Sequence, residues 1–248
     1  MSAALAAQLL VVDTAPRLGE THLTPPCTPD QAAAIAGAAA SDTLDAVRAT
    51  PVSRRVVALG GTPGDLDLSG CTVLPQVDGD LGTRLAAAFA DAMGPAGVGL
   101  PTLLIGTDTP QVTPALLAAC LDRLLSAGQG TAVLGTTPDG DWWALGLHSA
   151  CPAQVLPEVP MSRHDTGERT RAALVDAGVT VLDLPELTDV DRFPDAVSVA
   201  DACDPDTRTA RVVAEVAAVL DGGPGVPGTS APGQPRGTVT VPSPRSSR

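Results

Sequence analysis

Short apolar runs alternate along the chain with longer stretches in which apolar residues recur every three or four positions. The runs are typical of buried β-strands, and the recurring pattern is typical of amphipathic helices. Strands are predicted at 8–12, 54–59, 72–74, 103–105, 131–134, 142–147 and 179–184, and helices at 28–48, 80–93, 113–127, 165–177, 191–202 and 205–220. This alternation predicts an α/β protein with a largely parallel central sheet and helices on both faces.

The pattern stops near Gly222. Beyond it the chain is rich in Gly, Pro, Ser and Thr, with no acidic residue and almost no large apolar group. Such a segment cannot bury enough apolar surface to offset the entropy lost on ordering, so residues 222–248 are predicted to be a disordered tail. Residues 1–221 are expected to form one domain.

Net charge limits the classes of binding partner, and cysteine usage indicates the cellular compartment. The net charge is −13; the tail holds three Arg and no acidic residue, so the body carries −16, and no Lys is present. A body this acidic argues against nucleic acid or an anionic membrane as a partner. The five Cys form no C-x-x-C pair, no leader pattern is seen, and no apolar run approaches the ~20 residues needed to span a bilayer, so we expect a reduced cytoplasmic protein.

One strand leads directly into a carboxylate. Leu103–Ile105 is followed by Gly106-Thr107-Asp108, and Thr113-Pro114 then opens a helix. In open α/β sheets, ligands bind outside the carboxyl ends of the strands, so Thr107 and Asp108 are expected beside a ligand. A carboxylate there could hold Mg²⁺ or Mn²⁺ together with substrate phosphates. The alternative is a plain turn, because Asp-Thr-Pro is good turn sequence.

A second acidic stretch, Asp139-Gly140-Asp141, precedes Trp142-Trp143, the only two Trp of the chain. A second metal ligand or a sugar-facing carboxylate is one interpretation, with Trp as an apolar wall. A hairpin turn followed by core Trp is the other, and this stretch alone favours it.

A third stretch, Gly79-Asp80-Leu81-Gly82-Thr83-Arg84, places backbone N–H groups and one Arg at a helix start. This arrangement suits an anion. The alternative is a helix cap with a solvated Arg.

The fourth stretch, Met161-Ser162-Arg163-His164-Asp165-Thr166-Gly167, also precedes a helix. Neutral His164 could join a metal, and Arg163 with the helix N–H groups, Ser162 and Thr166 could take a phosphate. The alternative is an ordinary polar loop. The sequence contains no nucleophile elbow, no P-loop and no G-x-G-x-x-G after the first strand, which disfavours serine hydrolases, Walker-type ATPases and classical dinucleotide dehydrogenases.

Taken in order, these stretches resemble a family of small bacterial glycosyltransferase-A-like proteins related to nucleotide-diphospho-sugar transferases. Some members are labelled radical-SAM/selenodomain-associated or arsenosugar-biosynthesis transferases. The resemblance covers about residues 9–202. It is carried by Gly79–Leu85, Leu104–Asp108 with Pro110, Asp139-Gly140 with Leu145–Leu147, Met161-Ser162 with Thr166-Gly167, and Leu187 with Asp189-Val190-Asp191.

The resemblance implies a three-layer α/β/α nucleotide-diphospho-sugar transferase fold. It implies that Asp108 reaches a divalent cation on the diphosphate, and it places Asp139 at the second acidic position. Residues expected to bind the nucleotide or substrate are Gly79, Asp80, Gly82, Arg84, Thr107, Gly140, Trp142, Ser162 and Thr166. The metal candidates are Asp108, Asp139 and His164, and Asp141 is the candidate catalytic base.

The chain departs from that family in the loop after the first strand. Members typically carry a basic stretch ending Lys-Thr-Arg-Leu, whereas this chain has Glu20-Thr21-His22-Leu23. Exchanging cations for an anion and a mostly neutral His should weaken diphosphate binding, since close charges interact by roughly 1–4 kcal/mol. The usual Asp-Gly-Gly-Tyr likewise becomes Asp139-Gly140-Asp141-Trp142.

The sequence therefore predicts metal-dependent transfer of a sugar from a nucleotide-diphospho-sugar to a small-molecule acceptor. Two alternatives stay open: a nucleotidyltransferase acting on a phosphorylated acceptor, and a binding protein of the same fold that has lost activity.

Overall fold

A computed structural model describes residues 5–12, 22–94 and 99–221. The predicted tail, and the part of the first loop that contains Glu20, lie outside these ranges. The strands are β1 (Leu5–Val12), β2 (Val52–Leu59), β3 (Thr72–Pro75), β4 (Thr102–Ile105), β5 (Thr131–Thr136), β6 (Trp142–Leu147) and β7 (Thr180–Asp183). The helices are α1 (Pro29–Ala49), α2 (Leu81–Met93), α3 (Pro114–Ala127), the 3₁₀ helix η1 (Cys151–Glu158), α4 (Thr166–Asp176), α5 (Phe193–Ala202) and α6 (Arg208–Asp221).

Side-chain caps fix where the main helices begin. The Thr28 hydroxyl accepts from the N–H of Gln31, and the Gln31 amide oxygen accepts from the N–H of Thr28, which completes a capping box for α1. Asp80 caps α2 and Thr113 caps α3 in the same way, each accepting an N–H three residues ahead. None of the helices within the described ranges is long and apolar enough to cross a membrane.

The sheet has the strand order β3-β2-β1-β4-β6-β5-β7. Neighbouring strands are parallel except β6, which runs antiparallel to both β4 and β5. The central strand β4 pairs with β1 through Leu9–Leu103 and Val11–Ile105. Because β6 is reversed, the turn before it lies at the same edge of the sheet as the carboxyl ends of β1, β4 and β5. Three separate stretches of chain therefore meet at that edge.

Alternate residues of β1 point to opposite faces of the sheet, which gives two core layers. Leu9 and Val11 pack with buried residues of α1 and α3 on one face. Leu10 and Val12 pack on the other face with α2, η1 and Leu174 of α4. The expected three-layer α/β/α arrangement, with a mostly parallel sheet, is confirmed.

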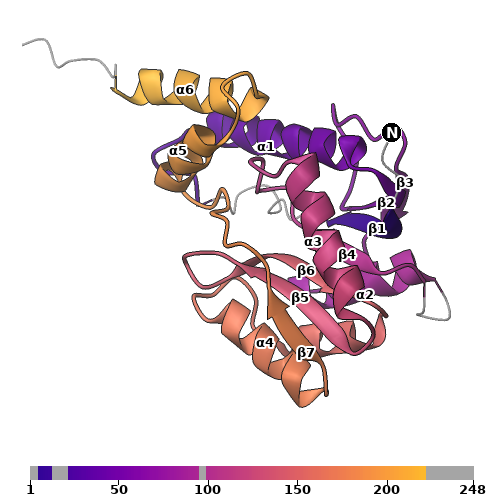
Figure 1. Cartoon of the computed structure of the whole chain (residues 1–248). Helices are drawn as coiled ribbons and strands as arrows, with labels where there is room; N and C mark the ends of the chain where they lie inside the picture. Colours follow the sequence, from indigo (N-terminus) through magenta and orange to yellow (C-terminus); the bar gives the residue numbers. More distant parts are fainter. Residues whose placement is uncertain (1–4, 13–21, 95–98, 222–248) are drawn as a thin grey trace, which may run out of the picture.

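The last two helices leave the sheet and pack on α1. Figure 1 shows α6 alongside α1 at one end of the molecule, with α5 beside them and α4 with β7 at the opposite end. A small core that includes Leu23, Ile35, Ala196 and Val213 joins these helices. The buried carboxylate of Asp42 on α1 accepts from the N–H and the hydroxyl of Thr209, each at 2.7 Å. These hydrogen bonds hold the start of α6 against α1, and we call this contact the Asp42–Thr209 clasp.

Two details differ from the sequence prediction. The helix η1 was not predicted, because its eight residues include Pro152 and Pro157 and carry no repeating apolar pattern. The last helix begins at Arg208 rather than near Pro205, because Thr207 N–H and hydroxyl turn back onto the Asp204 carbonyl. The other elements match the prediction to within a few residues at each end.

Candidate active site

The central strand delivers Asp108 to the edge of the sheet. All four residues of β4 are buried, and the chain then turns through Gly106 and Thr107. A β-carbon on Gly106 would lie 2.5 Å from Oδ1 of Asp108, so this position must be a glycine for the carboxylate to fold back against the strand end. Asp108 is half-buried and lines a large open cleft, together with Gly106 and Thr107. Asp108 thus lies in a cleft at the carboxyl end of the central strand, and its role toward a ligand stays a prediction.

The turn between β5 and β6 brings a second pair of carboxylates. The exposed Asp139 accepts from the Thr137 hydroxyl and from the N–H of Asp141, so its carboxylate shapes the turn. Asp141 is half-buried, and its Oδ1 accepts from the N–H of Trp142 at 2.9 Å. Both Asp side chains line the cleft. This stretch is therefore both a turn and part of the cleft lining.

A third stretch arrives at the same edge after β7. Residues 184–191, here called the return segment, run across the sheet edge from β5 toward β4. The N–H groups of Leu184 and Leu187 donate to carbonyls of Leu134 and Thr136, and the N–H of Val190 donates to the Asp108 carbonyl at 2.8 Å. The return segment thus carries Asp189 and Asp191 into the cleft beside Asp108.

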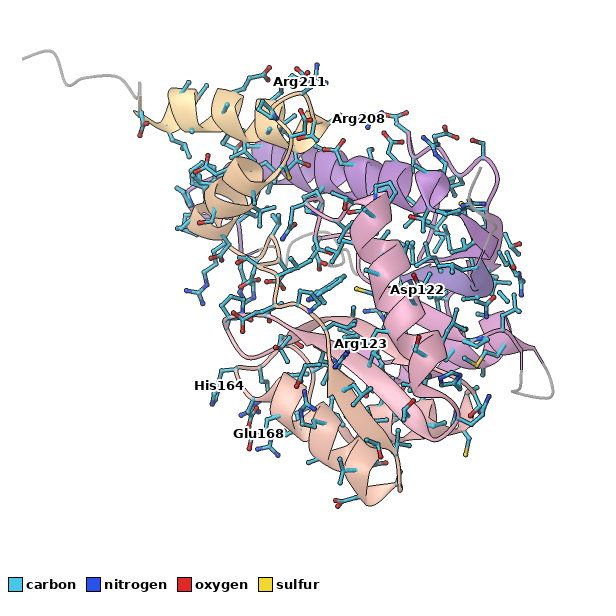
Figure 2. The ribbon with its side chains drawn as sticks, in the orientation of Figure 1. Asp122, Arg123, His164, Glu168, Arg208 and Arg211 are labelled. Carbon is cyan, nitrogen blue, oxygen red and sulfur yellow. The ribbon has the colours of Figure 1, made fainter. Side chains whose placement is uncertain are left out.

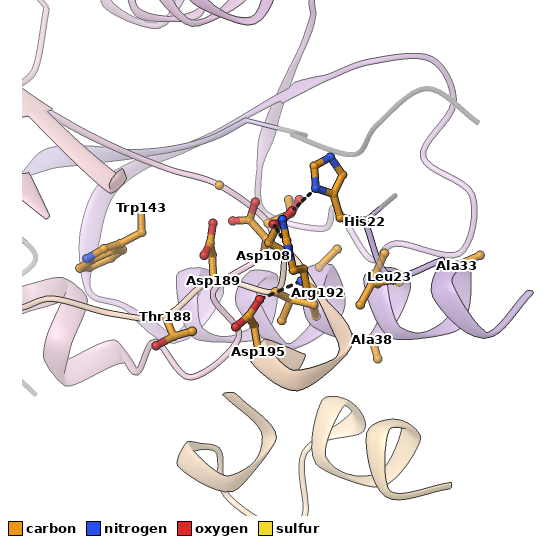
Figure 3. A pocket seen from close by; sticks show the side chains of 18 of the residues that line it. His22, Leu23, Ala33, Ala38, Asp108, Trp143, Thr188, Asp189, Arg192 and Asp195 are labelled. Atoms are coloured by element: carbon orange, nitrogen blue, oxygen red, sulfur yellow. Dashed lines mark hydrogen bonds and ion pairs between the residues drawn. The ribbon is translucent and has the colours of Figure 1, made fainter. Parts of the chain in front are cut away.

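Figure 3 shows Asp189 next to Asp108, with Trp143 and Thr188 on one side and His22 with Arg192 on the other. His22 Nδ1 lies 3.6 Å from Oδ1 of Asp191. His22 is therefore at the cleft, although no sequence pattern around it assigned it a role.

The carboxylates repel one another. Burial, followed by the charges of Asp108 and Asp139, raises the pKa of Asp189 to about 7. Burial, with smaller contributions from Asp139 and Asp108, raises the pKa of Asp141 to about 6 against the opposing hydrogen bond from Trp142 N–H. The surroundings of Asp141 and Asp189 therefore favour the protonated form of each carboxyl group.

The donor chemistry fits a hard divalent cation. Within the described ranges, no three or more His, Cys, Asp or Glu side chains converge as a ready-made metal site. Mg²⁺, however, is commonly held by one or two carboxylates, with substrate phosphates and water as the other ligands. Asp108 and Asp189 could supply two carboxylates. Asp139 is less suited, since its oxygen is engaged within its own turn.

The predicted anion-binding stretch divides into structural and cleft-lining residues. Asp80 caps α2, and the neighbouring Gly79 adopts φ +141°. Gly82 is buried where α2 packs on η1, and a β-carbon there would collide with the Leu156 carbonyl. Arg84 alone among these four lines the cleft, and it donates to the Gln76 amide oxygen at 2.8 Å.

The loop before α4 forms another wall of the cleft. Ser162 has φ +57°, the only positive φ of a non-glycine residue within the described ranges, and Ser162 and His164 are exposed and line the cleft. Figure 2 shows His164 at the outer margin of the molecule, on the loop before α4. Thr166 is buried, where its hydroxyl donates to the Pro160 carbonyl and accepts from Arg163 N–H. Thr166 thus stabilises the loop through these two hydrogen bonds.

The two Trp residues have different surroundings. Trp143 is buried, its ring lies against Gly135, and its Nε1 donates to the Pro185 carbonyl of the return segment. Trp142 is half-buried, lines the cleft and donates to the Thr170 hydroxyl at 3.1 Å. Trp143 also lines the cleft, but Trp142 has more exposed ring surface to offer a ligand.

Asp189 is one of several cleft residues to which the sequence assigns no role. Its stretch contributes only to the resemblance, since a short polar segment after an edge strand carries no local signal. Its position depends on hydrogen bonds to β4, β5 and their loops, which are far away in the sequence.

Comparisons with known proteins agree with this architecture. Residues 43–163, just under half of the chain, match the model of a family described as an uncharacterized protein conserved in bacteria, DUF2064. A provisionally named nucleotide-diphospho-sugar transferase from Desulfovibrio desulfuricans G20 superposes with a TM-score of 0.71. The alignment has 21% identity and covers 87% of this chain and 97% of that one.

Rv0371c from Mycobacterium tuberculosis H37Rv superposes with a TM-score of 0.52, at 21% identity over 79% of this chain and 98% of that chain. A structure of Rv0371c in complex with manganese aligns at 23% identity over 80% of this chain and 98% of that one, with a TM-score of 0.48. No protein of curated function matches the sequence. The fold expected from the resemblance is confirmed by the superposition on the Desulfovibrio protein.

Proposed function

We propose that this protein transfers a sugar from a nucleotide-diphospho-sugar to a small-molecule acceptor and requires Mg²⁺ or Mn²⁺. The observation that carries the proposal is the meeting of Asp108, Asp141 and Asp189, from three separate loops, in one cleft at the carboxyl end of the central strand. Ligands of open α/β sheets bind at this place.

Asp108 is the main metal-binding residue of the proposal, with Asp189 as its partner. The bound cation would supply the positive charge that neutralises the diphosphate and its leaving group. Without it, a diphosphate would approach a body of charge −16, which repels anions.

Other residues would bind and orient the substrates. Arg84 lines the cleft with a guanidinium already anchored on Gln76, so its remaining N–H groups can hold an anionic group. The half-buried ring of Trp142 would form an apolar wall for a sugar. Asp141 is the candidate proton acceptor from an acceptor hydroxyl, since its pKa of about 6 lies close to neutral pH.

The experiment is metal-dependent binding of UDP-glucose, GDP-mannose and CTP, measured by calorimetry with Mn²⁺ or with a chelator. Wild type should bind one of the diphospho-sugars only with the metal. Asp108→Asn should weaken this binding by about 100-fold, about 2.7 kcal/mol, and leave the melting temperature nearly unchanged. The matched control is Asp122→Asn, an exposed carboxylate on the outer side of α3 (Figure 2), which should bind like wild type.

Two other outcomes would change this functional assignment. A preference for CTP over both diphospho-sugars would indicate nucleotidyl transfer. Binding by Asp108→Asn equal to wild type would reduce this carboxylate to a turn residue and remove the main support for the proposal.

A further inference from the structure

Asp189 is held on both sides by one short stretch of the chain. Gln111 Nε2 donates to the carbonyl of Thr188 at 2.5 Å, and the N–H of Val190 donates to the carbonyl of Asp108 at 2.8 Å. Both anchors belong to residues 108–111, the loop that follows β4. The residues before and after Asp189 are thus fixed to the loop that carries Asp108.

Only one of these two hydrogen bonds can be removed by replacing a side chain. The bond from Val190 to Asp108 joins two backbones and survives any substitution except proline. The bond to Thr188 depends on the Gln111 side chain alone. Its amide spans 77 positions of the sequence to reach the return segment.

The side-chain amide of Gln111 carries a cost in folding free energy at this position. Gln111 is half-buried, and its Oε1 is buried with no hydrogen-bond partner in the described part of the chain. A buried acceptor without a partner costs roughly 1–3 kcal/mol. An apolar side chain of similar size would avoid that cost, so the single donor bond to Thr188 is what this residue contributes.

We infer that Gln111 is a positioning residue that sets the distance between the Asp189 and Asp108 carboxylates, so that the pair can bind one divalent cation. The inference rests on the proposed function in one respect, that these two carboxylates share a metal. Groups that orient metal ligands without touching the metal commonly change metal affinity by 10–100-fold when they are removed. Gln111 acts through the backbone of the return segment and touches neither cation nor substrate.

A double-mutant cycle separates positioning from a general structural effect. The variants are Gln111→Ala, Asp189→Asn and the double variant, and the probe is Mn²⁺ alone, titrated by calorimetry. Gln111→Ala should weaken Mn²⁺ binding by about 10-fold. In the Asp189→Asn background the same substitution should have no further effect, because the ligand that Gln111 positions is already gone.

Spectroscopy supplies a second readout. Tb³⁺ luminescence lifetimes in H₂O and D₂O count the water molecules on a bound ion. Gln111→Ala and Asp189→Asn should each raise that count by about one, and the double variant by no more than either alone. Gln111→Glu, similar in size but without a donor at pH 8, should behave like Gln111→Ala, and the exposed control Gln154→Ala should behave like wild type.

The outcomes are distinct. Losses that add in the double variant, or a Gln111→Ala variant that binds Mn²⁺ within twofold of wild type, would overturn the positioning role while leaving the proposed function intact. Wild type that binds neither Mn²⁺ nor Tb³⁺ would overturn the metal-binding pair of Asp108 and Asp189 and with it the positioning role, whereas the proposed function is tested separately by binding of Mn²⁺ together with a nucleotide-diphospho-sugar. If Gln111→Ala melts far below wild type, Gln111→Glu and Gln111→Met decide the question by the same cycle.

Discussion

Gly140 packs directly beneath the backbone carbonyl of His164, and a β-carbon on Gly140 would collide with that oxygen. Gly140 also has φ +95° and accepts at its own carbonyl from the N–H of Gly167. The turn that carries Asp139 and Asp141 is therefore locked to the loop before α4. This contact joins two walls of the cleft.

Substitution of Gly140 should consequently be severe. Gly140→Ala is expected to destabilise the protein by roughly 2 kcal/mol or more, since both the backbone conformation and the contact with His164 oppose a side chain. The matched control is Gly37→Ala within α1, where a β-carbon meets nothing within 4 Å. That change should be neutral or stabilising by up to about 1 kcal/mol. Chemical denaturation measures both, and equal effects would contradict the contact.

Asp189 should make the metal-free protein less stable as the pH rises. Its folded-state pKa of about 7 lies above the ordinary value of 3.8, so the folded state retains a proton that the unfolded state releases. Stability attributable to this group is present below pH 4 and is lost as the pH rises through 7. Asp189→Asn should therefore gain on the order of 2 kcal/mol at pH 8 and almost nothing at pH 4.

Thermal melts in chelator between pH 4 and 8 check this expectation. The exposed Asp122→Asn variant serves as the reference. If the Asp189→Asn and wild-type curves stay parallel across that range, Asp189 does not titrate as an uncompensated carboxylate.

Much of the fold could be predicted from the sequence because its signals are local. The caps at Thr28, Asp80 and Thr113 and the apolar runs of the strands depend on neighbours a few positions away. The hairpin turn favoured at Asp139–Asp141 was likewise a local signal for β6 running antiparallel to β5. The insertion of β6 between β5 and β4 had no such signal, because it depends on contacts between distant strands. Of the site, Asp108 followed from its place after a buried strand, which is again local information.

The rest of the site depends on contacts between distant residues. Asp189 becomes a cleft residue only because Trp143, Gln111 and Asp108 hold the return segment across the sheet edge. Conversely, Gly82 and Thr166 were expected to bind substrate because they lie at helix starts and in stretches that carry the resemblance, whereas the structure gives them packing and loop-stabilising contacts. Their roles toward a ligand stay predictions.

The clasp between Asp42 and Thr209 should hold the last two helices. Asp42 accepts three kinds of donor from the start of α6, namely the Thr209 N–H, the Thr209 hydroxyl and the Arg208 guanidinium. Asp42→Ala would leave the buried N–H and hydroxyl of Thr209 unsatisfied and is expected to cost about 3 kcal/mol. Asp45→Ala, which removes a more exposed partner of Arg208, should cost less than about 1 kcal/mol.

Limited proteolysis followed by mass spectrometry tests the clasp. Asp42→Ala should be cut near the start of α6 far faster than Asp45→Ala or wild type. Equal cleavage of all three proteins would show that the apolar contacts of α6 with α1 suffice.

The segment after α6 is expected to be dispensable. Truncation after Asp221 removes only residues whose composition lacks core-forming side chains, so the melting temperature should change by less than about 1 °C. A drop of several degrees in a thermal melt would show that these residues pack on the body.

The return segment also bears on how the protein is made. Thr188 must find Gln111 across 77 positions of sequence, and the entropy of closing so long a loop delays such contacts relative to local helices. On the ribosome, β4 and its Asp108 are complete long before Asp189 has been synthesised. In newly made chains the central strand is therefore complete before Asp189 exists, and the proposed metal pair can form only once synthesis has passed residue 190.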